Sequence, residues 1–154
     1  MFNIVLHQPE IPPNTGNIIR LCANTESKLH LIHPLGFVIS EKNLERAALD
    51  YGEGVEIIHH KNFEAFLQNT QLRSYYSVST KGEPMMNDIS IKAGDYLMFG
   101  SETKGLPKGC LTHEKCQKVI RIPMADGSRS LNLSNSVAII VYFALGQNDF
   151  TGLS

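Results

Sequence analysis

The chain has 154 residues, of which 42% are hydrophobic and 19% are charged, and its formal net charge at pH 7 is −1. This length and balance predict one globular domain over residues 1–154, and the near-neutral charge argues against bulk electrostatic capture of nucleic acid while allowing a local basic patch. The three cysteines exclude a fully paired disulfide framework, and the lack of a membrane-length apolar run or a signal-like N-terminus predicts a cytoplasmic protein with no membrane partner.

In its first half, the chain alternates short apolar runs with stretches of helical spacing. Three prolines within residues 9–13 predict an extended loop after the first strand. The helix that follows is predicted from about Asn14 to Thr25, with Asn14 as its N-cap, and Ser40 is predicted to cap a short second helix. The strands of this half are predicted at residues 2–6, 29–32 and 55–58.

The second half continues the alternation of strands and helices. Asn62 is predicted to cap a helix, and a short helix is predicted after Pro107. The strands are predicted at residues 75–78, 96–99 and 119–122. The last helix carries a helically spaced apolar stripe made of Leu133, Val137, Ile140, Val141 and Ala144. This alternation predicts an α/β layer fold with a mostly parallel sheet.

Loops rich in Gly, Ser and Thr follow the last three predicted strands. Carboxyl ends of parallel strands meet at one edge of a sheet, so these loops are expected to form one pocket lined by backbone N–H and C=O groups. Polar residues crowd residues 128–136, at the start of the last helix, beyond what capping needs. Arg20, on the first predicted helix, is either a ligand-facing arginine or a solvated surface arginine.

The sequence contains partial matches to familiar ligand-binding motifs, and none of them is complete. The glycines at residues 100–105 have P-loop spacing, but the Lys and Ser/Thr that should follow the second glycine are absent. Cys110, His113 and Cys116 lack the paired-cysteine spacing of a zinc site, so no metal is predicted. The adjacent His59 and His60 close a predicted strand, where alternation predicts one packed and one solvated side chain. Pattern alone therefore indicates a backbone-rich pocket without naming a reaction.

Three segments together resemble the SPOUT class of S-adenosylmethionine-dependent RNA methyltransferases. They read NTGNIIR at 14–20, LMFGSETKGLP at 97–107 and IPMADGSRSLNLSNSVA at 122–138. Their order and spacing are similar to the ribose 2′-O-methylating branch, and HQPEIP at 7–12 with Asp50-Tyr51 looks like the minimal subfamily that methylates the wobble nucleotide of leucine tRNAs. Ser101 stands where many members carry proline, which should affect loop stiffness more than chemistry.

The resemblance implies an α/β fold with a deep C-terminal trefoil knot and an obligate homodimer built from the first and last helices. It implies S-adenosyl-L-methionine as cofactor, S-adenosyl-L-homocysteine as product and no metal. The substrate would be the ribose 2′-hydroxyl of a wobble cytidine or uridine in a tRNA anticodon stem-loop. The residues that match the family's cofactor contacts are Val78, Gly100, Ile122, Ser130 and Leu131.

The same resemblance implies the reacting and RNA-contacting residues. Arg20 matches the family's arginine, which serves either as the base or as a clamp that binds the adjacent phosphate and stabilises charge on the 2′-oxygen. Asn14, Glu102 and Asn132 match the polar set around it. The cations that flank the pocket loops are Lys81, Lys104, Arg121 and Arg129, and they are expected to contact RNA together with Tyr142, which would lie near the partner subunit.

Three other functions remain open at this point. An rRNA ribose methyltransferase is the nearest, although such enzymes often carry an extra RNA-binding domain. A non-catalytic RNA-binding knot protein should have lost either Arg20 or the loop around Asn132, and both are present. A flavodoxin-like small-molecule binder would purify with a yellow flavin.

Overall fold

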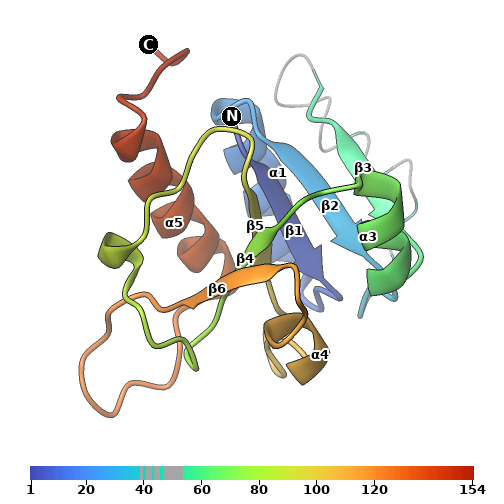
Figure 1. Ribbon diagram of the computed structural model, residues 1–154. Coiled ribbons are helices and arrows are strands. Elements are labelled where there is room, and N and C mark those ends of the chain that lie inside the picture. The colour runs from blue at the N-terminus through green and yellow to red at the C-terminus, as the bar shows by residue number, and fades with distance from the viewer. Residues whose placement is uncertain (39, 41–42, 44–45, 47–53) are drawn as a thin grey trace.

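A computed structural model describes residues 1–38, 40, 43, 46 and 54–154. Six strands form one sheet in the order β3-β2-β1-β5-β4-β6, and each neighbouring pair is parallel (Figure 1). This confirms the predicted α/β fold with a parallel sheet. The strands are β1 Asn3–His7, β2 Lys28–Ile32, β3 Ile57–His60, β4 Tyr75–Val78, β5 Tyr96–Phe99 and β6 Cys116–Ile120.

Helices cover both faces of the sheet. Ile4 of β1 lies in one hydrophobic cluster with residues of α1 and α5, whereas its neighbour Val5 lies in a second cluster with Phe66 and Cys110. This is the alternation expected of a strand that is buried on both sides. The helices whose bounds lie within the described residues are α1 Pro12–Asn24, α3 Phe63–Thr70, the 3-10 helix η1 Met86–Asp88, α4 Lys108–Leu111 and α5 Leu133–Gln147. Among the described residues, no helix is long and apolar enough to cross a membrane.

The first helix begins earlier than the sequence suggested. Pro12 and Pro13 lie within α1, whose N-cap is Ile11 and has no side-chain capping bond. Proline fits the first turn of a helix because the N–H groups there have no intrahelical acceptor. The predictions of an extended loop through residue 13 and of Asn14 as N-cap are therefore wrong, and Asn14 is freed to bind elsewhere.

Two strands are displaced from their predicted positions. β3 occupies Ile57–His60 rather than residues 55–58, and β6 occupies Cys116–Ile120 rather than 119–122. Pairing decides the end of β6: its partner β4 ends at Val78, which lies opposite Ile120. Arg121 makes only an isolated parallel bridge with Met85.

Other local predictions are confirmed. Asn62 caps α3, with its Oδ1 accepting from Ala65 N at 2.8 Å. His59 is exposed and His60 is buried, as strand alternation required. Most of the predicted helix after Ser40, and the Asp50-Tyr51 pair, lie outside the described residues.

Candidate active site

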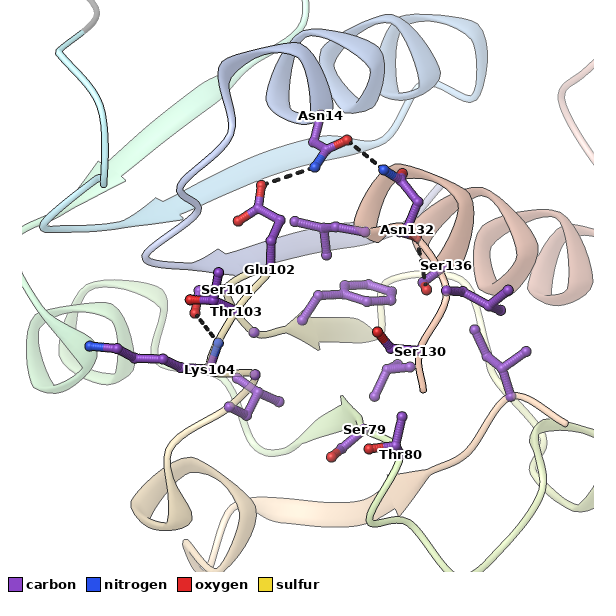
Figure 2. A pocket seen from close by; sticks show the side chains of 18 of the residues that line it. Asn14, Ser79, Thr80, Ser101, Glu102, Thr103, Lys104, Ser130, Asn132 and Ser136 are labelled. Carbon is purple, nitrogen blue, oxygen red and sulfur yellow. Dashed lines mark hydrogen bonds between the residues drawn. The ribbon is translucent and has the colours of Figure 1, made fainter. Parts of the chain in front are cut away.

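The strand order explains where a pocket can form. β1, β5, β4 and β6 are consecutive neighbours in a parallel sheet, so the loops that follow them emerge side by side at one edge. A pocket of about 510 Å³ lies there, within the range of small-molecule sites. It is lined by residues 78–81, 99–106, 122, 124 and 130–133, together with Ile11, Asn14 and Ser136 (Figure 2).

All five residues predicted to bind cofactor line this pocket, namely Val78, Gly100, Ile122, Ser130 and Leu131. Gly100 has a steric reason to be glycine: a Cβ there would lie 2.0 Å from the carbonyl carbon of Gly105. The loop after β5 thus folds back on itself, with Ser101 bridged to Gly105. Glycine at position 100 is what allows the two ends of the loop to approach this closely.

A hydrogen-bonded chain of side chains runs along the rim of the pocket (Figure 2). Asn132 Oδ1 caps α5 by accepting from Ser134 N at 2.9 Å, which leaves Asn132 Nδ2 to donate to Asn14 Oδ1 at 3.0 Å. Asn14 Nδ2 then donates to Glu102 Oε1 at 3.1 Å. Each amide has one orientation in this chain, so the cap of α5 fixes the direction of every bond up to Glu102.

The Glu102 carboxylate accepts three hydrogen bonds in this arrangement. Besides Asn14, it accepts from Glu10 N at 2.7 Å and from Ile11 N at 3.0 Å. Such charge-assisted bonds hold the loop before α1 against the loop after β5. Glu102 therefore acts as an organiser of two pocket walls.

The chain matches a model of a known protein family. The model described as the SpoU rRNA methylase family matches residues 1–142. The chain belongs to the SpoU rRNA methylase family. This confirms the methyltransferase family that the three sequence segments indicated.

Similar proteins extend over nearly all of this SpoU-family chain. A tRNA (cytidine(34)-2′-O)-methyltransferase of Saccharophagus degradans is 52% identical over 99% of each chain. A solved structure described as giving structural insights into the 2-OH methylation of C/U34 on tRNA is 40% identical, with a TM-score of 0.87 over 97% of each chain. The SpoU methyltransferase AviRb of Streptomyces viridochromogenes, in complex with AdoMet, shares the fold at 22% identity, with a TM-score of 0.82 over 96% of this chain and 60% of AviRb.

The pocket brings together some of the predicted RNA-contacting cations and not others. Lys81 and Lys104 line it and are exposed. Arg129 is exposed on the loop before α5 and does not line the pocket. Arg121 also lies outside the lining, and its Nε is buried without a hydrogen-bond partner among the described residues.

Arg20 and Tyr142 lie apart from the pocket of their own chain. Arg20 is exposed on α1, six residues from Asn14, which corresponds to about 9 Å along a helix axis. Tyr142 is 48% exposed on α5 and borders a separate cavity formed with the end of α1 and the C-terminal tail. The single chain therefore does not assemble the whole predicted set at one place.

Sequence reasoning missed Glu10 and Thr103 as members of the site. The Thr103 hydroxyl donates to Glu10 at 2.8 Å from Oε1 and 2.9 Å from Oε2. Glu10 follows β1, whose neighbour in the sheet, β5, precedes Thr103, so the two loops meet. The pairing of β1 with β5, however, could not be read from one sequence.

Cys110, one of the three residues of the rejected zinc motif, has a packing role. Cys110 is buried in the second hydrophobic cluster, and its carbonyl accepts from the Tyr75 hydroxyl at 2.6 Å. Burial raises the pKa of the Cys110 thiol to about 12, which disfavours the thiolate that a metal requires. Among the described residues, no group of three or more His, Cys, Asp and Glu is arranged to hold a metal ion.

Proposed function

We propose that this chain transfers a methyl group from S-adenosyl-L-methionine to the ribose 2′-hydroxyl of the wobble cytidine or uridine of tRNA, with leucine isoacceptors as the preferred substrates. One observation carries the proposal: the five residues matched to cofactor contacts line one pocket, and Asn14, Glu102 and Asn132 form a continuous hydrogen-bonded rim beside it. The full-length similarity to a cytidine(34) methyltransferase supports the substrate.

The pocket's residues fit such a cofactor. Its volume of about 510 Å³ and its mixture of backbone groups with the apolar Val78, Ile122 and Leu131 suit an adenine ring attached to polar ribose and amino-acid parts. When bound, S-adenosyl-L-methionine supplies an electrophilic methyl group and leaves as S-adenosyl-L-homocysteine. The side chains of the rim supply position, because methyl transfer requires the reacting atoms to be held in line.

Within this proposal, Arg20 binds the phosphate next to the reacting ribose and stabilises negative charge on the 2′-oxygen. A guanidinium suits this role better than that of a base, because it stays protonated in proteins and offers a rigid fork of donors. Since Arg20 does not line the pocket of its own chain, we assign it to the pocket of a second copy.

The proposal therefore includes a homodimer in which α1 and α5 of the two chains meet. Ile139 and Tyr142 on α5 are 36% and 48% exposed, and Ile11 beside α1 is 43% exposed. Exposed apolar side chains on α5 and next to the start of α1 support an interface there. Tyr142 would then contact RNA together with residues of the partner subunit.

We also propose that the C-terminal part of the chain forms the trefoil knot. The segment between β4 and β5 contacts both β6 and α5, the two elements that would thread past it in a knot. Gly82 is pressed against the backbone of β6, where a Cβ would lie 2.6 Å from Val119 O. At the other end, Gln147 of α5 donates to Ile89 O at 2.7 Å and accepts from Ile91 N at 2.9 Å.

Lys81, Lys104, Arg121 and Arg129 are proposed to contact tRNA phosphates around the pocket mouth. Lys81 and Lys104 suit this role directly, because both are exposed at the pocket. Arg121 has a buried Nε and would present only the outer part of its guanidinium. With tRNA as its substrate, the protein is proposed to act in the cytoplasm.

The decisive experiment is methyl transfer from labelled S-adenosyl-L-methionine into total tRNA from cells lacking this gene. Nuclease digestion and mass spectrometry would locate the methyl group, with Arg20→Ala as the comparison. A 2′-O-methyl at the wobble ribose of leucine tRNA, lost in Arg20→Ala, is the expected result. Transfer to rRNA instead would keep the chemistry and reject the substrate, and no transfer to any RNA despite cofactor binding would reject the activity.

A further inference from the structure

Two neighbouring carboxylates hold the loop after β1 and the loop after β5 against each other from opposite sides. Glu102, on the β5 loop, accepts from the backbone N–H groups of Glu10 and Ile11. Glu10, on the β1 loop, accepts from the Thr103 hydroxyl through both carboxylate oxygens, at 2.8 and 2.9 Å. Each carboxylate therefore fixes the loop that carries the other.

The Glu10 carboxylate acts as a hydrogen-bond acceptor, and its pKa is lowered. The Thr103 hydroxyl is the main cause that lowers the pKa of Glu10, followed by the Ser101 hydroxyl, with a smaller contribution from the Lys104 charge. An ionised Glu10 carboxylate offers strong acceptors to the Thr103 hydroxyl. Thr103 lines the pocket, so the group that Glu10 holds is part of the pocket wall.

The loop that Glu10 holds needs such a restraint. It lies between Gly100 and Gly105, and Gly105 has a φ of +66°. Glycine adopts this φ readily, but it loses more conformational freedom than any other residue when the loop is ordered. Within the loop, Gly105 N donates to Ser101 O at 2.9 Å. That bond closes the base of the loop, whereas the Thr103 hydroxyl ties its exposed tip to Glu10.

Glu10 is itself fixed from behind. Gly36 N donates to Pro9 O at 2.9 Å, and a Cβ on Gly36 would lie 2.9 Å from the Glu10 Cα. The segment after β2 therefore packs closely against the backbone of Glu10. A carboxylate held on a fixed backbone can position a flexible loop, whereas a mobile one could not.

We propose that Glu10 is a positioning residue of the cofactor pocket, which holds Thr103 so that residues 100–106 keep the shape that binds the cofactor. This inference rests on the proposed function, since it assumes that the pocket binds S-adenosyl-L-methionine. It assigns Glu10 to binding rather than to the chemical step, because Glu10 acts only through the loop.

The test compares cofactor binding and turnover in four variants of the full chain. S-adenosyl-L-homocysteine affinity is measured by titration calorimetry, and methyl transfer to tRNA at saturating cofactor is measured separately. Glu10→Gln removes the charge, and Thr103→Val removes the hydroxyl while keeping the shape of the side chain. Thr103→Ser restores the hydroxyl, and the double variant Glu10→Gln/Thr103→Val reports whether the two residues act through one contact.

We expect Glu10→Gln and Thr103→Val each to weaken cofactor binding about tenfold, as loss of a charge-assisted bond predicts. Thr103→Ser should bind within about twofold of the unaltered protein, and the double variant should be no weaker than either single variant. The rate at saturating cofactor should fall far less than the affinity.

Three results would overturn the inference: unchanged affinity in Glu10→Gln, additive losses in the double variant, or a fall in saturated rate with unchanged affinity. Thr103→Val keeps the test decisive if Glu10→Gln fails to fold. Failure of the unaltered protein to bind S-adenosyl-L-homocysteine would instead contradict the proposed function, so the two failures are distinguishable.

Discussion

Asn132 Nδ2 donates to Asn14 Oδ1 at 3.0 Å, and this bond joins the first turns of the first and last helices across 118 residues of sequence. Asn132 has two tasks that use different atoms. Its Oδ1 caps α5 through Ser134 N and Asn135 N, while its Nδ2 continues the rim toward Glu102. The two tasks can therefore be separated by mutation.

Replacement of Asn132 by Asp keeps the capping oxygen and removes the donor to Asn14. Asp is a good N-cap, and its charge is favourable at a helix N-terminus, so the capping contribution should be kept. The free energy of unfolding should fall by about 1–3 kcal/mol only through the buried Asn14 oxygen, which loses its donor. Methyl transfer should fall at least about tenfold, because the side chain of Asn14 would no longer be held in one orientation by a donor at position 132. Urea unfolding and the tRNA assay measure the two effects.

The matched variant Asn132→Ala removes both the cap and the donor. It should lose activity as Asn132→Asp does and should also lose about 1 kcal/mol of stability from the missing cap. Full activity in Asn132→Asp would show that the contact with Asn14 has no part in the reaction.

Gly100 offers a test of the pocket wall. Gly100→Ala would place a methyl group 2.0 Å from Gly105 C. The atoms that this methyl group would meet belong to the backbone, so the loop must move. Cofactor affinity should drop by about two orders of magnitude or more, which calorimetry would detect. Gly109→Ala is the control, because nothing lies within 4 Å of a Cβ there. Equal cofactor affinities in the two variants would contradict the close approach.

The sequence predicted the pocket better than the edges of the elements around it. Glycine-rich and serine-rich loops after Val78 and Phe99 could be placed at one sheet edge because parallel strands end there together. The start of α1 could not be placed, since a proline pair is compatible with both an extended loop and a helix's first turn. Nor could the partner of Asn14, because the neighbour of β1 is settled by long-range strand pairing.

A buried histidine pair makes the fold sensitive to acid. His30 Nδ1 lies 3.0 Å from His60 Nε2, and the stacked rings pack against Phe66. Burial, reinforced by the neighbouring His60, lowers the pKa of His30 to about 4. Burial also lowers the pKa values of His60 and His7. These groups therefore bind protons more readily in the unfolded chain.

The direction of the change in stability with pH follows from the difference in proton binding between the folded and unfolded chains. Between pH 6.5, where His30 protonates in the unfolded chain, and about 4, where it protonates in the folded chain, stability falls as pH falls. One such group changes the free energy of unfolding by up to about 1.4 kcal/mol per pH unit in this window. Urea unfolding at pH 7.5, 6 and 5 would measure it. His30→Gln should flatten the dependence, and an unchanged slope in that variant would rule out His30 as its source.

The position of Arg20 predicts complementation between two inactive proteins. Arg20→Ala retains an intact cofactor pocket, and Gly100→Ala retains Arg20 but loses the pocket, so each alone should be inactive. If Arg20 of one chain serves the pocket of the other, a mixed dimer contains one complete site. Random exchange makes half of the dimers mixed, so activity should recover to about a quarter of that of the unaltered protein.

Arg20→Ala should also bind S-adenosyl-L-homocysteine with unchanged affinity, because Arg20 does not line the pocket. The complementation is measured by unfolding the two proteins together, refolding the mixture and assaying methyl transfer to tRNA. Mixing without refolding is the control for subunit exchange. If refolded mixtures stay inactive while size-exclusion chromatography shows dimers of both chains, Arg20 must act on the pocket of its own chain, and the shared-site assignment is wrong.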